Sequence, residues 1–176
     1  MMSRALRVAP LTALAVLMSI GAAGASHQEN GSNGSPRDFA VGTAQSGEMK
    51  VAFSAHGGPG TEDVTGHFRA GGALADLGME EVGEFQFLGP VTCLVVDGNR
   101  AGLFYPINQA KTDPDELEEG FEEMGVFIFL KDGGKQDSDE VGFLGPVPLQ
   151  NAPACFLGPT EPIDKGNITV HDADGE

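Results

Sequence analysis

The chain has 176 residues, with 26 Asp and Glu against 10 Lys and Arg, which gives a formal net charge of −16 at pH 7. Proteins bind phosphate backbones through Lys and Arg that displace counterions, so this charge argues against nucleic acid and anionic membrane surfaces as partners. Solubility in a saline or cation-rich medium explains the acidity without a specific role.

An N-terminal signal peptide is predicted over residues 1–25. Arg4 and Arg7 supply positive charge, residues 10–23 are almost wholly apolar, and the run ends in the small-x-small pattern Ala23-Gly24-Ala25 that signal peptidase cleaves. The alternative is a membrane anchor, but a spanning helix needs about 20 apolar residues, and this run is shorter. We therefore expect a secreted, extracellular protein with no stable membrane insertion after cleavage.

The mature chain is expected to have two parts. Residues 26–37 are rich in Gly, Ser and Asn, which is typical of a flexible polar leader. Residues 38–174 have the usual length of one domain with its own hydrophobic core. The sequence therefore predicts a single domain there.

The first strong pattern in this domain has a period of two. Between residues 49 and 56, every second side chain is apolar and Lys50, Ser54 and His56 fall on the opposite face, which predicts a half-buried strand. Residues 65–70 resume the pattern, with Phe68 and Ala70 inward. The two segments predict a hairpin with a loop of moderate length.

Further strands are expected along the rest of the chain, at 85–87, 91–96, 101–107, 126–130, 139–144 and 167–171. The apolar runs at 91–96 and 126–130 predict strands that are covered on both faces. Asp97-Gly98 is the strongest hairpin signal in the chain. The tetrapeptide Phe-Leu-Gly-Pro occurs at 87–90, 143–146 and 156–159, and we interpret each copy as a strand end that enters a turn.

One short helix is predicted after residue 112. Asp113, Pro114 and Glu116 form a helix-start signal, and Leu117, Phe121 and Met124 then recur on one helical face. Because strands and Gly or Pro turns dominate the remainder, the predicted class is all-β, a mainly antiparallel sandwich or barrel with one short helix. Periodicity does not separate the sandwich from the barrel.

The two cysteines, Cys93 and Cys155, both lie in the mature part. Export implies an oxidising environment, where an even pair is first interpreted as a disulfide. The alternatives are a metal pair or a reactive thiol. Zinc prefers several Cys or His ligands at short spacing, which this sequence does not supply.

The best candidate for a metal site combines His56 and His67 with Glu62 or Asp63. Both histidines fall on the polar side of strands that are expected to pair, and the two carboxylates lie in the loop between them. Two imidazoles and a carboxylate are a reasonable set of metal ligands. The competing interpretation is two surface histidines beside a sheet.

Calcium is a second candidate, because acidic residues cluster in two segments: Asp113, Asp115, Glu116, Glu118 and Glu119, and then Asp132, Asp137, Asp139 and Glu140. Calcium needs six to eight converging oxygens from a shaped loop. Neither segment has the spacing of the helix-loop-helix calcium motif, nor does the Asp172-Ala173-Asp174-Gly175 tail complete one. Solvated acidic loops are the simpler interpretation.

Catalytic motifs give little support for an enzyme. The sequence has no Gly-x-Ser-x-Gly elbow and no phosphate-binding Gly-rich loop. Trp is absent and Tyr105 is the only tyrosine, which disfavours sugar binding by aromatic stacking.

Several segments resemble a family of secreted actinobacterial proteins of unknown function. They are Phe53-Ser54-Ala55-His56-Gly57, Gly66-His67-Phe68, residues 91–101, Lys131-Asp132-Gly133-Gly134 and residues 166–173. The resemblance implies a small exported β-domain, often with one Cys before the Asp-Gly turn and another near a Pro-rich segment. The resemblance implies no activity for this chain. The chain differs from the family in its acidic insert around 111–124.

The sequence therefore predicts a non-catalytic exported module that binds something, such as another extracellular protein, or contributes to the structure of the cell exterior. The alternative is a metal-binding protein or a metal-dependent enzyme centred on His56 and His67. No cofactor is expected; calcium or another divalent metal is the alternative, and a calcium-stabilised surface protein is a third possibility.

Overall fold

A computed structural model describes residues 37–57, 63–80, 82–113, 115–152 and 154–175. The predicted signal peptide and almost all of the predicted leader lie outside the described residues. Within the described ranges, the structure has no helix long and apolar enough to span a membrane.

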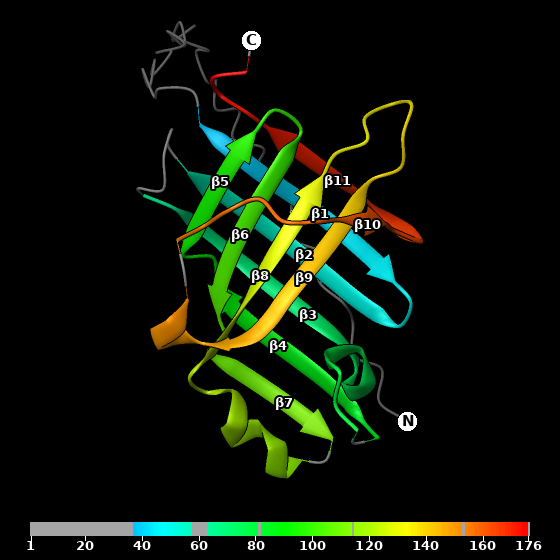
Figure 1. Cartoon of the computed structure of the whole chain (residues 1–176), viewed down its shortest axis with the longest axis vertical. Helices are drawn as coiled ribbons and strands as arrows, with labels where there is room; N and C mark the ends of the chain where they lie inside the picture. Colours follow the sequence, from blue (N-terminus) through cyan, green and yellow to red (C-terminus); the bar gives the residue numbers. More distant parts are fainter. Residues whose placement is uncertain (1–36, 58–62, 81, 114, 153, 176) are drawn as a thin grey trace, which may run out of the picture. The chain divides into compact units, whose positions relative to one another are not determined.

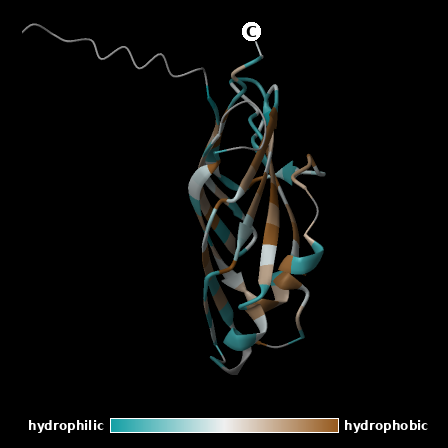
Figure 2. Cartoon of the chain, turned by 90° about the vertical axis from the view of Figure 1, so that its left-hand side faces the viewer, coloured by the Kyte–Doolittle hydropathy of each residue, from teal (hydrophilic) through white to brown (hydrophobic). Residues whose placement is uncertain are grey.

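The described part is an antiparallel β-sandwich of two sheets, which lie as two layers when viewed from the side (Figures 1 and 2). Sheet A has six strands, in the order β11 (Lys165–His171), β1 (Asp38–Ser46), β2 (Met49–Gly57), β3 (Thr65–Ala73), β4 (Glu84–Pro90) and β7 (Gln109–Asp113). Sheet B has five, in the order β10 (Glu161–Pro162), β9 (Glu140–Pro148), β8 (Met124–Lys131), β6 (Arg100–Pro106) and β5 (Cys93–Asp97).

The hydrophobic core lies between the sheets, because every second residue of each long strand points inward. In β2, Val51, Phe53 and Ala55 are buried while Lys50 and His56 are exposed, as the sequence predicts. Sheet B contributes Leu103, Tyr105, Ile128 and Leu130, among others. The rings of Phe68 from sheet A and Tyr105 from sheet B stack with centroids 4.1 Å apart, and burial raises the pKa of the Tyr105 hydroxyl.

A second apolar cluster lies on the outer face of sheet B. Phe104 from β6 and Phe127 and Phe129 from β8 are buried there, together with the half-buried Cys93 and Cys155. The cluster is covered by residues 154–160, called the strap below, which cross the front of sheet B in Figure 1. The ring of Phe156 lies 5.2 Å from that of Phe127 and 5.1 Å from that of Phe129.

Glycines in sheet B make room for the strap. A Cβ on Gly102 in β6 would collide with the backbone of Phe156, and a Cβ on Gly142 in β9 would collide with that of Pro159. Arg100 holds the strap from the side, because its Nη2 donates a hydrogen bond of 2.6 Å to the carbonyl of Gly158. The strap therefore lies directly on the sheet, at positions where a side chain would separate the two.

The predicted hairpins are present. β2 pairs with β3, and β5 pairs with β6 around a two-residue turn at Gly98 and Asn99, in which Gly98 has a φ of 60°. A positive φ is readily adopted by glycine, which explains why Gly98 takes the first position of the turn, while Asp97 is the last residue of β5.

Three expectations need correction. The apolar run at 91–96 forms the edge strand β5 and is only partly buried, because its outward side meets the strap region and not a second sheet; β8 is covered on both faces as predicted. The second Phe-Leu-Gly-Pro copy lies within β9 and the third lies in the strap, so only the copy in β4 ends a strand. The short helix is the 3₁₀ helix η2 (Asp115–Phe121), with Phe121 buried.

Candidate functional site: the outer face of sheet A

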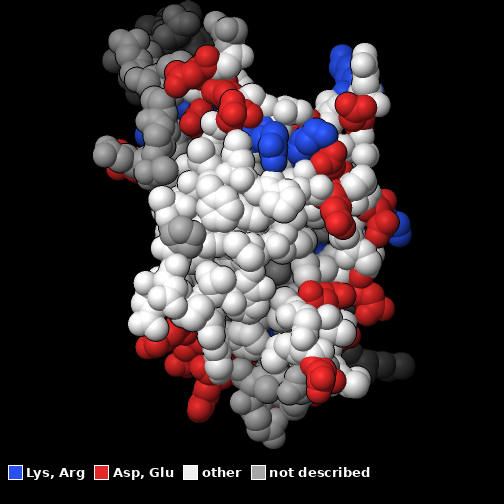
Figure 3. Space-filling model, in the orientation of Figure 1, with Lys and Arg blue, Asp and Glu red and all other residues white. Residues whose placement is uncertain are grey.

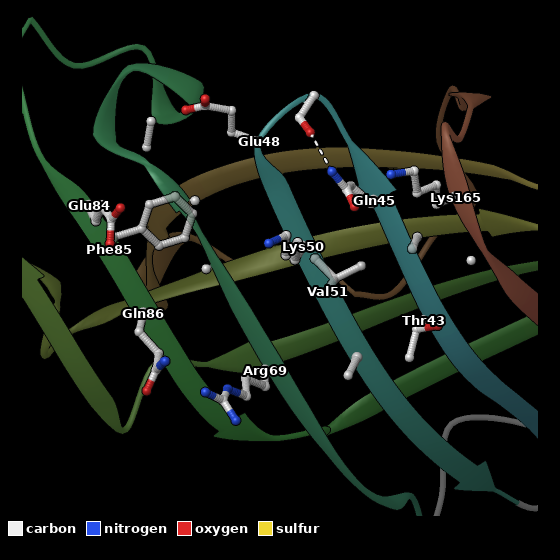
Figure 4. A pocket seen from close by; sticks show the side chains of 17 residues that line it. Thr43, Gln45, Glu48, Lys50, Val51, Arg69, Glu84, Phe85, Gln86 and Lys165 are labelled. Atoms are coloured by element: carbon white, nitrogen blue, oxygen red, sulfur yellow. Dashed lines mark hydrogen bonds between the residues drawn. The ribbon is translucent and has the colours of Figure 1, made fainter.

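The outer face of sheet A carries a regular line of polar side chains across all six strands. Residues in register on neighbouring strands form one row, which we call the cross-strand row: Lys165, Gln45, Lys50, Gly71, Gln86 and Lys111. The row therefore contains three lysines and two side-chain amides, with one position that has no side chain. Figure 4 shows Lys165, Gln45 and Lys50 next to one another along this row.

A fourth cation lies beside the row. Arg69 is exposed on β3, in register with Ala52 on β2 and Leu88 on β4. It is therefore a diagonal neighbour of both Lys50 and Gln86, at a distance that long side chains span. We call Lys50, Arg69, Lys111 and Lys165, together with Gln45 and Gln86, the cation–amide face.

This face is hollowed. A depression of about 870 Å³ is lined by Lys50, Arg69 and Lys165, by Gln45 and Gln86 between them, and by Gly71 and its neighbours (Figure 4). A second depression, of about 630 Å³, adjoins it along the same sheet face, since both are lined by Ala52 and Arg69. The small residues Ala52 and Gly71 lower the floor of the hollow between the longer polar side chains.

The electrostatics of the face are opposite to those of the chain. In the six strands of sheet A, the only carboxylates on the outer face are Glu84 and Asp113, which lie together at one end, beyond the cross-strand row. Among the described residues, the single ion pair joins Lys131 and Glu140 in sheet B, so no described carboxylate lies within 4.0 Å of the four face cations.

Figure 3 shows the opposite side of the sandwich, where uncharged atoms fill the centre and acidic side chains lie around the margin, with Lys and Arg beside them in the upper part of the view. The four face cations are exposed to solvent, and the carboxylates of Glu48 and Glu84 line the same hollow toward the strand ends.

The structure places His56 and His67 on the same exposed face of adjacent strands. They are diagonal and not directly opposite, because His56 is in register with Thr65 and His67 with Ser54. Ser54 Oγ lies 3.3 Å from His56 Nε2. Asp63 is exposed with a φ of 56°, and Glu62 lies outside the described residues. Within the described part, no group of three or more His, Cys, Asp or Glu is arranged to hold a metal.

The acidic segment after β8 has a structural role that the sequence did not reveal. Asp139 Oδ2 accepts a hydrogen bond of 2.6 Å from the N–H of Ile168, and its Oδ1 accepts one of 2.9 Å from Gly133. Asp132 Oδ2 accepts one of 3.2 Å from Val170. Ile168 and Val170 belong to the edge strand β11, so these carboxylates take the place of a neighbouring strand and connect sheet B to sheet A.

Two other carboxylates show lowered pKa values with clear causes. Hydrogen bonds from Lys131 and then Thr160 lower the pKa of Glu140, which lies beside the end of the strap. Backbone hydrogen bonds from Gly98 and then Asp174 lower the pKa of Asp172. In the other acidic segment, Glu118 Oε1 accepts a hydrogen bond from the N–H of Thr112. These groups stabilise turns and loops.

Cys93 and Cys155 form the predicted disulfide, with an S–S distance of 2.05 Å and Cα atoms 5.9 Å apart. The bond joins the edge strand β5 to the start of the strap. It is on the outer side of sheet B and does not contact the cation–amide face.

Sequence reasoning did not identify the cation–amide face. The alternation in β2 did place Lys50 on the polar side, but each strand contributes only one or two of the residues. A search for cations at outward positions of several strands would have predicted a cationic sheet face, although not the register in which the strands pair.

No protein-family model, curated protein or solved structure matches this chain. The fold and the site therefore define the class: a disulfide-closed, antiparallel β-sandwich with a hollowed cation–amide face on its six-stranded sheet.

Proposed function

We propose that this protein is a secreted, non-catalytic binding module that takes an anionic ligand on the cation–amide face. The observation that carries the proposal is the concentration of Lys50, Arg69, Lys111 and Lys165 on one sheet face of a chain with a net charge of −16. Lysine and arginine side chains donate charge-assisted hydrogen bonds to carboxylates and phosphates, and such bonds are stronger than those between neutral groups.

The geometry favours binding over catalysis. The face consists of extended strands with exposed, flexible cationic side chains, whereas general acid–base or nucleophilic catalysis requires paired groups held at hydrogen-bond distance. The Ser54–His56 contact is on the same sheet face, but no described carboxylate orients the imidazole. A secreted module is supported by the N-terminal signal pattern and by a disulfide, which persists in oxidising compartments.

Isothermal titration at low salt tests the proposal, with hyaluronate oligosaccharides and poly-L-glutamate as anionic probes and neutral dextran as the uncharged control. We expect at least one anionic probe to bind and dextran not to bind. The double variant K50Q/R69Q should bind about 20-fold more weakly, because each exposed charge pair contributes up to about 1 kcal/mol.

The charge control is K135Q, because Lys135 is an exposed lysine in the β8–β9 loop and lies outside sheet A. It removes one positive charge without touching the face, so its affinity should stay within twofold of the native protein. Raising the salt concentration should weaken binding of the native protein through screening. If neither anionic probe binds, or if K50Q/R69Q and K135Q behave alike, the proposal fails.

A further inference from the structure

Building on the proposed function, we infer that the ligand is an acidic polysaccharide in which carboxylate-bearing sugars alternate with neutral sugars, and that it lies across the strands along the cross-strand row. The inference comes from the order of groups in the row, which is cation, amide, cation, gap, amide, cation.

The spacing of the cations requires an extended ligand. Neighbouring strands are about 4.8 Å apart, so Lys165 and Lys50 lie two strands, or about 10 Å, apart at the backbone. Lys50 and Lys111 lie three strands, or about 14 Å, apart. A single small anion reaches one of these positions, together with Arg69 beside Lys50. A chain with anionic groups separated by neutral units reaches all of them.

The amides match the neutral units. Sugar hydroxyls both donate and accept hydrogen bonds, and a Gln side chain does the same. Gln45 Nε2 already donates to the carbonyl of Gly47 at 3.1 Å, which orients the side chain and leaves its Oε1 as an acceptor for a hydroxyl (Figure 4). Gln86 lies between Gly71 and Lys111 in the row. Gly71 has no side chain, which leaves space for a sugar ring above the strand.

The acidic surroundings disfavour a densely charged ligand. Glu84 and Asp113 border one side of the row, and Glu48 contributes to the lining of the hollow at the same end. A polyphosphate or a nucleic acid would bring charges close to these carboxylates, whereas a polymer with one carboxylate on every second sugar has fewer charges to be repelled. Recognition by charge and amide groups also does not need exposed aromatic rings.

The test compares three probes by isothermal titration against the purified protein. Hyaluronate oligosaccharides alternate a uronate with a neutral sugar, poly-L-glutamate carries carboxylates without hydroxyls, and polyphosphate is densely charged. At equal concentration of anionic groups and equal salt, we expect hyaluronate to bind at least fivefold more tightly than either of the others.

The variants Q45L/Q86L and K50Q/R69Q separate the two kinds of contact. The amide variant should weaken hyaluronate binding about fivefold, a loss expected for a few neutral hydrogen bonds, and leave poly-L-glutamate binding unchanged. The cation variant should weaken both. Thermal melts of each variant establish that the domain is folded.

The outcomes distinguish this inference from the proposed function. If all three polyanions bind with similar affinity and Q45L/Q86L has no effect, the face is a general anion site; the polysaccharide inference is then overturned and the proposed function stands. The same holds if polyphosphate binds most tightly and at least one of the other two probes also binds. If none of the three probes binds, both fail.

Discussion

Replacing Asp139 with Ala should destabilise the sandwich, because this carboxylate is one of two that connect the sheets. The side chain is half-buried and accepts two backbone hydrogen bonds, of 2.6 Å from Ile168 in β11 and 2.9 Å from Gly133 in the β8–β9 loop. A hydrogen bond to a charged group contributes about 1.5–3 kcal/mol. Because the site is partly open to water, we take the lower end for each bond and expect a total loss of about 3 kcal/mol.

Urea unfolding followed by circular dichroism measures this loss directly, and a Tm about 10 °C lower should accompany it. The D139N variant keeps one acceptor oxygen and should lose roughly half as much. The control is D137A, because Asp137 lies in the same loop, is exposed, and its carboxylate accepts no hydrogen bond from the described residues. If D139A is within about 0.5 kcal/mol of D137A, the carboxylate does not connect the sheets and the reasoning is wrong.

Three shorter predictions concern the disulfide, pH and metals. The C93S/C155S variant should lose about 4 kcal/mol of unfolding free energy, because the bond closes a loop of 62 positions in the unfolded chain; an unchanged urea midpoint would contradict this. The pKa of Glu140 is lowered in the folded state, so its contribution to stability is complete above the pKa of the unfolded chain and is lost as the pH falls through the folded value. E140Q should therefore flatten the acid limb of the stability–pH curve measured by urea unfolding, and an unchanged limb would count against it. EDTA, calcium and zinc should leave the Tm unchanged, since the described residues offer no group of three converging ligands; a zinc-dependent rise that is lost in H56A/H67A would instead favour a metal site.

Much of the local structure follows from the sequence, because it depends on neighbouring residues. Alternation over residues 49–56 determines which side of β2 is buried, and Asp97-Gly98 marks the turn of the β5–β6 hairpin. The even pair of cysteines in an exported chain predicts the disulfide. The edge position of β5 was missed because an apolar strand has the same pattern whether a sheet or a strap covers its second face.

The pairing of distant segments was also beyond the sequence. β1 was not identified as a strand, although it pairs with both β2 and β11, and β11 follows it by more than a hundred residues. The carboxylates of Asp132 and Asp139 were interpreted as solvated because the N–H groups that donate to them, on Val170 and Ile168, are remote in the chain. Local patterns contain no information about which strand edge a loop will meet.

Composition and short-range periodicity are sufficient to predict the class, which is an acidic all-β domain with a disulfide and a secretion signal pattern. The cation–amide face, in contrast, depends on how distant strands pair. Lys50, Lys111 and Lys165 are scattered over more than a hundred positions, and their alignment requires the register of all six strands of sheet A. Register is set by long-range packing and pairing, in which a shift of one residue would turn each of these side chains to the opposite face of the sheet.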